Sequence, residues 1–344
     1  MRIATPSLIS SLLLNFLLAL CAVNRSDAQD ATPSPAAPLA FRPGETWPDS
    51  DGQHINAHGG GILYQNGIYY WFGKKRGGRP SSQGVSVYSS KDLYQWKNEG
   101  VALSTSQDNN SDIAAGCVME RPKVLHNASR GTYVMWFHLE LRGQGYNAAR
   151  AGVATSGKVT GPYAFVKSFR PNNNMSRDMA LFLDDDGKAY HIYAARDNYD
   201  MRICQLSDDF LSPTTNDVMV ASDHREGPAM FKYRGKYFLI TSACTGWTPN
   251  AANYYTADHP LGPWTSHPNP CAGTNFATTF GGQSAFVLAL PAKPDAFIFM
   301  ADRWNPRDLA NSRHLWLPIE FKGGDMVIAW HDEWSLNWFE KNPQ

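Results

Sequence analysis

The sequence lacks a net charge, a helical repeat and, after its first residues, any long hydrophobic run. Its 31 basic and 31 acidic side chains cancel and are mixed along the chain, so it has no basic patch of the kind that nucleic acids or membrane surfaces require. No helical period extends beyond a turn or two, which excludes helical bundles. No later run approaches about 18 apolar residues, so no membrane-spanning helix is expected. These absences favour a β-rich protein with a neutral partner, neither nucleic acid nor membrane.

Cysteine is also scarce, with five in 344 residues. Cys21 could carry a lipid, but the bulky Leu20 before it argues against this. The other four follow no zinc-ligand spacing and are too widely separated for a small disulfide framework: Cys117, Cys204, Cys244 and Cys271. In an exported protein Cys244 could pair with Cys271; alternatively, all four are small buried strand residues.

The first 40 residues do not have the pattern of a folded domain. An apolar run over residues 8–23 follows Arg2 and ends in small residues, which indicates a secretory signal peptide over residues 1–28. Residues 29–40 are rich in Pro and Ala without periodicity and are predicted to be a disordered linker. We therefore expect a secreted protein, extracellular or periplasmic, whose folded part is residues 41–344.

Four short segments in the folded part are variants of one pattern. Each is a turn pair ending in Gly followed by an aromatic or β-branched run, which is typical of a tight hairpin followed by a buried strand. They begin at residues 66 (NGIYYWFG), 130 (RGTYVMWF), 186 (DGKAYHIY) and 234 (RGKYFLIT), and a weaker copy begins at 294 (PDAFIFMA). The unit recurs roughly every 50 to 65 residues. This period and the strand-forming composition predict an all-β, single-domain five-bladed β-propeller.

The residues just before each hairpin belong to the innermost strand of a blade, so they are expected to converge at one end of the central axis. Three of these five positions carry a carboxylate beside an arginine: Glu120, Asp178 and Glu226. One such acid would normally be a solvated surface residue, but three at equivalent positions of a repeat indicate a site. Crowded carboxylates shift each other's pKa values, as acid catalysis at a glycosidic bond requires.

Aromatic residues make up 12% of the chain and include 11 tryptophans. Most lie in predicted strands and are expected in the core. Trp247 lies instead in the turn-rich segment TGWTPN, where an exposed indole would offer a flat apolar face to a sugar ring. The alternative is an indole packed on the edge of a blade.

Taken together, these motifs resemble glycoside hydrolase family 43 and, within it, the exo-β-1,3-galactanases. The resemblance covers residues 49–338 and rests on INAHGGGILYQNGIYYWFG, MERPKVL with YVMWFH, SRDMALFLDDDGKAY, TGWTPN and FGGQSAFV. It implies a five-bladed propeller and an inverting hydrolase. Such an enzyme releases galactose from the non-reducing end of β-1,3-galactan, the backbone of arabinogalactan.

The resemblance also implies roles for individual residues. Glu226 matches the general acid, Asp178 the carboxylate that tunes its pKa, and Glu120 a third acid that holds substrate. No carboxylate stands where the wider family has its base, and Gln283 matches the glutamine that positions or activates water in this branch. His58 is a competing base by its chemistry. Sugar-binding segments of the family match the stretches that contain Tyr146, Asn198, Thr245 and Trp247.

Lys74 and Arg196 stand where these galactanases usually carry acids, so the sugar specificity is open. One alternative is an α-L-arabinofuranosidase or another exo-glycosidase of the family; a second is a non-catalytic sugar-binding propeller. A third is a phosphorylase in which Lys74, Lys75, Arg76 and Arg196 hold phosphate. No metal or other cofactor is expected, because residues 184–186 (DDD) are interpreted as a hairpin turn rather than as calcium ligands. A monomer is expected.

Overall fold

The computed structural model describes residues 39–79 and 83–343. The predicted signal peptide and almost all of the predicted linker lie outside these ranges. In the described part no helix is long and apolar enough to cross a membrane.

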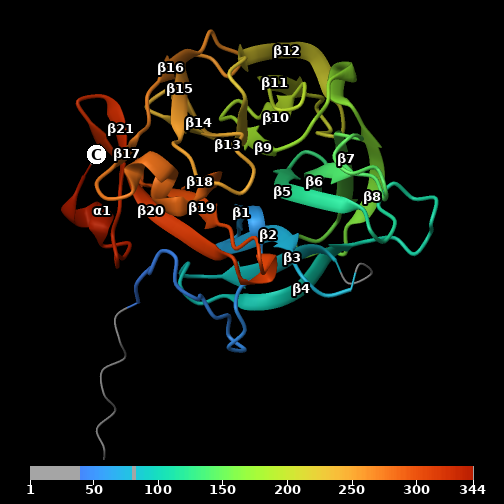
Figure 1. Ribbon diagram of the computed structural model, residues 1–344, viewed down its shortest axis with the longest axis horizontal. Coiled ribbons are helices and arrows are strands. Elements are labelled where there is room, and N and C mark those ends of the chain that lie inside the picture. The colour runs from blue at the N-terminus through green and yellow to red at the C-terminus, as the bar shows by residue number, and fades with distance from the viewer. Residues whose placement is uncertain (1–38, 80–82, 344) are drawn as a thin grey trace, which may run out of the picture. The chain divides into compact units, whose positions relative to one another are not determined.

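The strands form five sheets around a central axis, which confirms the predicted five-bladed propeller (Figure 1). The first blade consists of β1 (His58–Gln65), β2 (Ile68–Lys75), β3 (Gly84–Ser90) and β4 (Lys97–Ser104). The second consists of β5 (Val118–Asn127), β6 (Thr132–Glu140), β7 (Arg150–Ser156) and β8 (Ala164–Phe169). The third consists of β9 (Met179–Leu183), β10 (Ala189–Ala195), β11 (Asp200–Leu206) and β12 (Pro213–Ala221).

The last two blades complete the ring. The fourth consists of β13 (Arg225–Tyr233), β14 (Lys236–Ala243), β15 (Asn253–Ala257) and β16 (Thr265–His267). The fifth consists of β18 (Gln283–Ala289), β19 (Phe297–Arg303), β20 (Arg313–Lys322) and β21 (Asp325–Ala329), with β17 (Cys271–Ala272) parallel to β21 at its outer edge. Among the described residues, helical structure is limited to α1 (Trp338–Lys341) and the 3-10 turns Pro171–Asn173, Phe276–Gly281 and Leu309–Asn311.

The repeated segments form the hairpin between the first two strands of each blade. Asn66 and Gly67 both have positive φ, as do Arg234 and Gly235, so these two hairpins have the turn geometry that suits the twist of paired strands. The first strands β1, β5, β9, β13 and β18 each contact the next around the ring, and β18 contacts β1. They therefore line the axis, as the repeats predicted.

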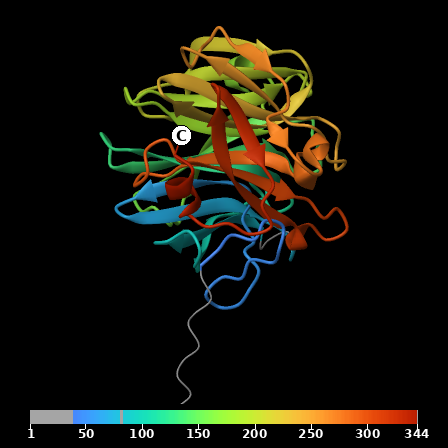
Figure 2. The same ribbon diagram turned by 90° about the vertical axis from the view of Figure 1, so that its left-hand side faces the viewer.

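The first and last blades are joined by segments from both ends of the described chain, and both views show them side by side (Figures 1 and 2). Phe41 forms an antiparallel bridge with Trp334, with N–H to carbonyl distances of 2.7 and 3.1 Å. Their rings lie 4.5 Å apart, and Trp71 and Trp316 pack beside them with ring centres 4.9 Å apart. Trp71, Trp316 and Trp334 therefore pack together where the first and last blades meet.

Candidate active site

Three of the inner strands have a β-bulge at the same end, and the bulged residues lie near the propeller axis. The strand register shifts just after His58, Glu120 and Glu226. The residue that follows each has a positive φ: Gly59 at 60°, Arg121 at 53° and Gly227 at 61°. Such bulges redirect a side chain that regular pairing would place against the neighbouring blade. The shared position explains why these residues of distant segments converge.

A cavity of about 250 Å³ lies at this end of the axis. A second set of lining residues comes from equivalent loops, those that join the second and third strands of the blades. In chain order these loops contribute Arg76, Tyr146, Asn198, Trp247 and Trp304. The cavity thus combines side chains on inner strands with side chains on one type of loop from all five blades.

All but one of the catalytic and sugar-binding residues predicted from sequence line this cavity: His58, Glu120, Tyr146, Asp178, Asn198, Glu226, Trp247 and Gln283. The exception is Thr245, which is not among the lining residues. Its hydroxyl donates to the carbonyl of Thr248 at 2.6 Å and accepts from the Asn250 amide at 2.7 Å. Thr245 therefore shapes the loop that presents Trp247, whose side chain is exposed and lies edge-on to Trp304 at 5.8 Å.

Glu226 has the environment of a protonated carboxyl. Burial, and then the negative charge of Asp178, raise its pKa to about 7, against the lowering effects of Cys244 and Arg121. The Gln283 amide donates to Oε1 at 2.7 Å and the Asn198 amide to Oε2 at 3.1 Å. A carboxyl that keeps its proton near neutral pH can deliver it to a departing oxygen.

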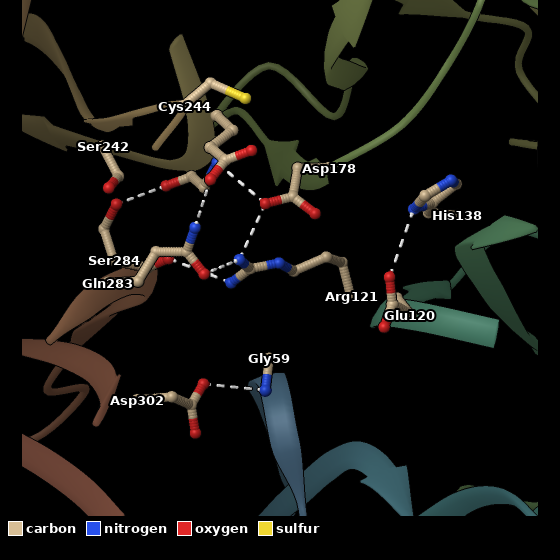
Figure 3. Close-up of polar contacts among 12 residues, drawn as sticks. Gly59, Glu120, Arg121, His138, Asp178, Ser242, Cys244, Gln283, Ser284 and Asp302 are labelled. Atoms are coloured by element: carbon tan, nitrogen blue, oxygen red, sulfur yellow. Dashed lines mark hydrogen bonds and ion pairs between the residues drawn. The ribbon is translucent and has the colours of Figure 1, made fainter. Parts of the chain in front are cut away.

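Asp178 and Gln283 are held by the same guanidinium, that of Arg121. Arg121 Nη2 lies 2.7 Å from Asp178 Oδ2 and also donates to Gln283 Oε1, while Nη1 donates to the carbonyl of Ser284 at 3.0 Å. Figure 3 shows both side chains turned toward Arg121. Because the guanidinium has three partners, it can hold Arg121 in a backbone conformation that usually requires glycine.

Gln283 is fixed at both ends of its amide. Its oxygen accepts from Arg121 and from the Trp304 indole at 2.8 Å, while its nitrogen donates to Glu226. The amide therefore lies in direct contact with the acid, and two donors polarise its carbonyl. This arrangement suits an amide that orients a water molecule, and the role in water activation stays a prediction.

His58 lines the cavity but is fully buried, and its Nε2 has no hydrogen-bond partner. Its Nδ1 lies 3.4 Å from Asp302, and burial lowers its pKa to about 4 in spite of that carboxylate. The imidazole is therefore neutral at pH 7.

Asp302 contacts His58, Gly59 and His314 between the first and fifth blades. It accepts from the Gly59 N–H at 2.8 Å and lies 3.2 Å from His314 Nδ1. The ligand atoms of His58, Asp302 and His314 lie within 4.8 Å of one another, so among the described residues these three could hold a metal ion. Asp302 already accepts these hydrogen bonds and His314 Nε2 lies 3.1 Å from the Ile55 carbonyl, so without an ion only His58 Nε2 of this group has no partner.

Glu120 lines the same cavity from β5 and lies beside His138, whose Nδ1 is 3.8 Å from Glu120 Oε2 (Figure 3). Burial opposes its ionisation, but Lys74 and Arg76 hold the pKa of this carboxyl well below its usual range. Lys74, which departs from the galactanase pattern, is thus inside the cavity. Arg196, the other departure, pairs with Asp200 at 2.7 Å and is not a lining residue.

Two further sequence interpretations are resolved by the structure. The four described cysteines are free, so Cys244 and Cys271 do not pair; Cys271 is buried and Cys244 lies beside Glu226.

Asp184 receives hydrogen bonds from Lys232 at 2.8 Å and from Tyr237 at 2.5 Å. Residues 184–188 form the predicted hairpin turn.

Sequence reasoning missed Arg121, Trp304 and Asp302 as parts of the site. An arginine beside each acid was visible, but the sequence does not show that Arg121 and Arg177 line the cavity whereas Arg225 bonds to Thr241. Trp304 follows β19 directly, and its equivalence to Trp247 could have been inferred from the repeat alone.

Comparisons with known proteins agree with this geometry. A β-1,3-galactosidase of family 43 solved with galactodeoxynojirimycin is 46% identical in sequence to this chain. The match covers 86% of this chain and 100% of the galactosidase chain, with a TM-score of 0.83. An exo-β-1,3-galactanase from Phanerochaete chrysosporium solved with β-1,3-galactotriose is 36% identical in sequence. The match covers 87% of this chain and 68% of the galactanase chain, with a TM-score of 0.79.

Among curated proteins, a β-D-galactofuranosidase of Aspergillus niger is 28% identical over 215 residues, which are 58% of this chain. The chain spans only 61% of the length of that relative. The sequence profile of glycosyl hydrolases family 43 matches residues 58–301. Because this match includes well over half of the sequence, the chain belongs to glycosyl hydrolase family 43.

Proposed function

We propose that this protein is an exo-acting, inverting glycoside hydrolase that removes galactose from the non-reducing end of β-1,3-galactan, including the arabinogalactan backbone. The observation that carries the proposal is the half-buried Glu226, whose pKa is raised to about 7 in a cavity where the other two lining carboxylates are paired with cations. The names of the two solved relatives support galactose and the β-1,3 linkage. The apolar leader sequence supports export.

In the proposed reaction Glu226 donates its proton to the glycosidic oxygen as the bond to the sugar breaks. A water oriented by the Gln283 amide attacks the opposite face of the sugar, and the anomeric configuration inverts. Asp178 raises the pKa of Glu226 and is held in place by its ion pair with Arg121. His58, a neutral imidazole, lines the same cavity.

The proposal is tested by following the products formed from β-1,3-galactan, arabinogalactan and arabinan. We expect galactose alone from the first two, appearing initially as the α-anomer in proton NMR spectra. Cleavage of arabinofuranosides only would contradict the proposal in favour of the neighbouring specificity. Binding without product would indicate a sugar-binding propeller, and a sugar phosphate formed on addition of phosphate would indicate a phosphorylase.

A further inference from the structure

The cavity wall formed by Lys74, Arg76 and Glu120 has more positive charge than its carboxylate balances. Lys74 Nζ and Arg76 Nη2 both contact the same oxygen, Glu120 Oε1, at 3.1 and 2.9 Å. The other oxygen accepts from the Tyr146 hydroxyl at 3.0 Å. In residues 39–79 and 83–343, no second carboxylate forms an ion pair with either cation. Two cations therefore share one anion.

The other two cations that line the cavity are paired elsewhere. Arg121 contacts Asp178 at 2.7 Å, and Arg177 contacts Asp197 at 2.6 Å. With Glu226 protonated, the surplus charge is located at the wall formed by Lys74 and Arg76. This local excess of positive charge is not apparent from the net charge of the whole chain, which is zero.

Arg76 is held in place before any ligand binds. Its backbone N–H and carbonyl both bond to the Asn56 side chain at 2.8 Å, and its guanidinium lies over the Trp304 ring at 5.2 Å. Its Nε is buried without a hydrogen-bond partner, and so is His138 Nδ1, which lies 3.8 Å from Glu120 Oε2 on the same wall. A buried polar group without a partner is costly unless a ligand supplies one.

We propose that this wall binds an anionic group, either a carboxylate or a sulfate ester, on the galactose that enters the cavity or on a sugar attached to it. The proposal rests on the galactosidase function above and narrows its substrate class to acidic galactans. A fixed guanidinium beside an ammonium is a typical receptor for oxyanions. The same burial that lowers the pKa of Lys74 makes its charge costly without a second anion.

The test measures binding directly, by calorimetry, with three methyl β-glycosides: galactoside, galacturonide and galactoside 6-sulfate. We expect at least one anionic sugar to bind about 10-fold or more tightly than the neutral one, since charge-assisted hydrogen bonds replace neutral ones. The galacturonide and the sulfate separate the two kinds of anion. Equal or weaker binding of both would overturn the proposal.

Variants of the cavity wall test whether Lys74 and Arg76 cause the preference for anionic sugars. Arg76→Gln and Lys74→Gln should bring the anionic-to-neutral affinity ratio toward one, whereas Arg76→Lys should keep part of it. Arg196→Gln is the matched control, because this arginine is exposed and lies outside the cavity lining. Its ratio should equal that of the wild type, and a ratio insensitive to Arg76→Gln and Lys74→Gln would contradict the proposal.

Hydrolysis separates this proposal from the function on which it rests. If the wild type releases galactose from β-1,3-galactan but shows no preference for anionic sugars, only the present inference fails. If anionic sugars bind preferentially but no galactoside is cleaved, the proposed hydrolase function fails and the anion site stands.

Discussion

The same inner strands line two different cavities at the two ends of the propeller axis. At one end is the charged pocket of about 250 Å³; at the other is a cavity of about 340 Å³ lined largely by apolar side chains, among them Leu63, Leu125 and Leu181. Lys123 lies at the boundary, where its ammonium donates to the carbonyls of Gly59 and Arg121 at 2.9 and 3.3 Å. Regular strand pairing continues at the apolar end, whereas the charged end is bulged. Activity should therefore depend on one end and stability mainly on the other.

The largest effect is expected for Glu226→Gln at the charged end. The amide keeps the size of the side chain but removes the proton that the leaving oxygen needs, so kcat/KM on β-1,3-galactobiose should fall about 10²- to 10⁴-fold. An aryl galactoside whose leaving group departs unaided should lose much less. Equal losses on both substrates would show that Glu226 is not the acid.

Gln283→Ala comes next, because water must be oriented whichever group leaves. We expect about a 100-fold loss or more in kcat on both the disaccharide and the aryl galactoside. His58→Ala is the matched comparison from the same pocket. Turnover near that of the wild type in Gln283→Ala together with collapse in His58→Ala would make the histidine the base.

At the apolar end, Leu181→Ala should act on stability. Leu181 is buried in β9 and packs in the core between blades two and three, so its truncation should lower the free energy of unfolding by about 2–5 kcal/mol. Denaturant melts measure this loss, and kcat/KM of the folded fraction should keep its pH profile. A shifted profile would mean that the two ends are coupled through the inner strands.

The smallest effect concerns the pH dependence. Glu226 must be protonated to act and its pKa is about 7, so kcat/KM should decline as the pH rises through about 7. The hydrogen bond from Cys244 lowers this pKa, so Cys244→Ala should raise it and extend activity to higher pH. Cys204→Ala, a buried cysteine of the third blade, is the control that should leave the profile in place.

The sequence was sufficient to predict the fold because each blade repeats the same hairpin, so even the weak copy at residue 294 could be placed. It was sufficient to bring the three carboxylates together because they occupy equivalent positions just before those hairpins, whereas Gln283 was predicted from the family resemblance. It was insufficient for Arg121 and Asp302. The inward turn of Arg121 depends on a positive φ at a bulge, and Asp302 acts through contacts with residues more than 240 positions earlier. Neither local pattern nor composition records such long-range contacts.

The bridge between Phe41 and Trp334 also has a consequence for how the chain reaches this structure. Its two halves come from opposite ends of the propeller sequence, so the ring cannot shut until nearly the whole chain has been synthesised. Contacts this distant in sequence form slowly, because the loop between them must first be closed. Until then the apolar sides of the first and last blades lack their partners, and the incomplete ring is the species most exposed to aggregation or proteolysis.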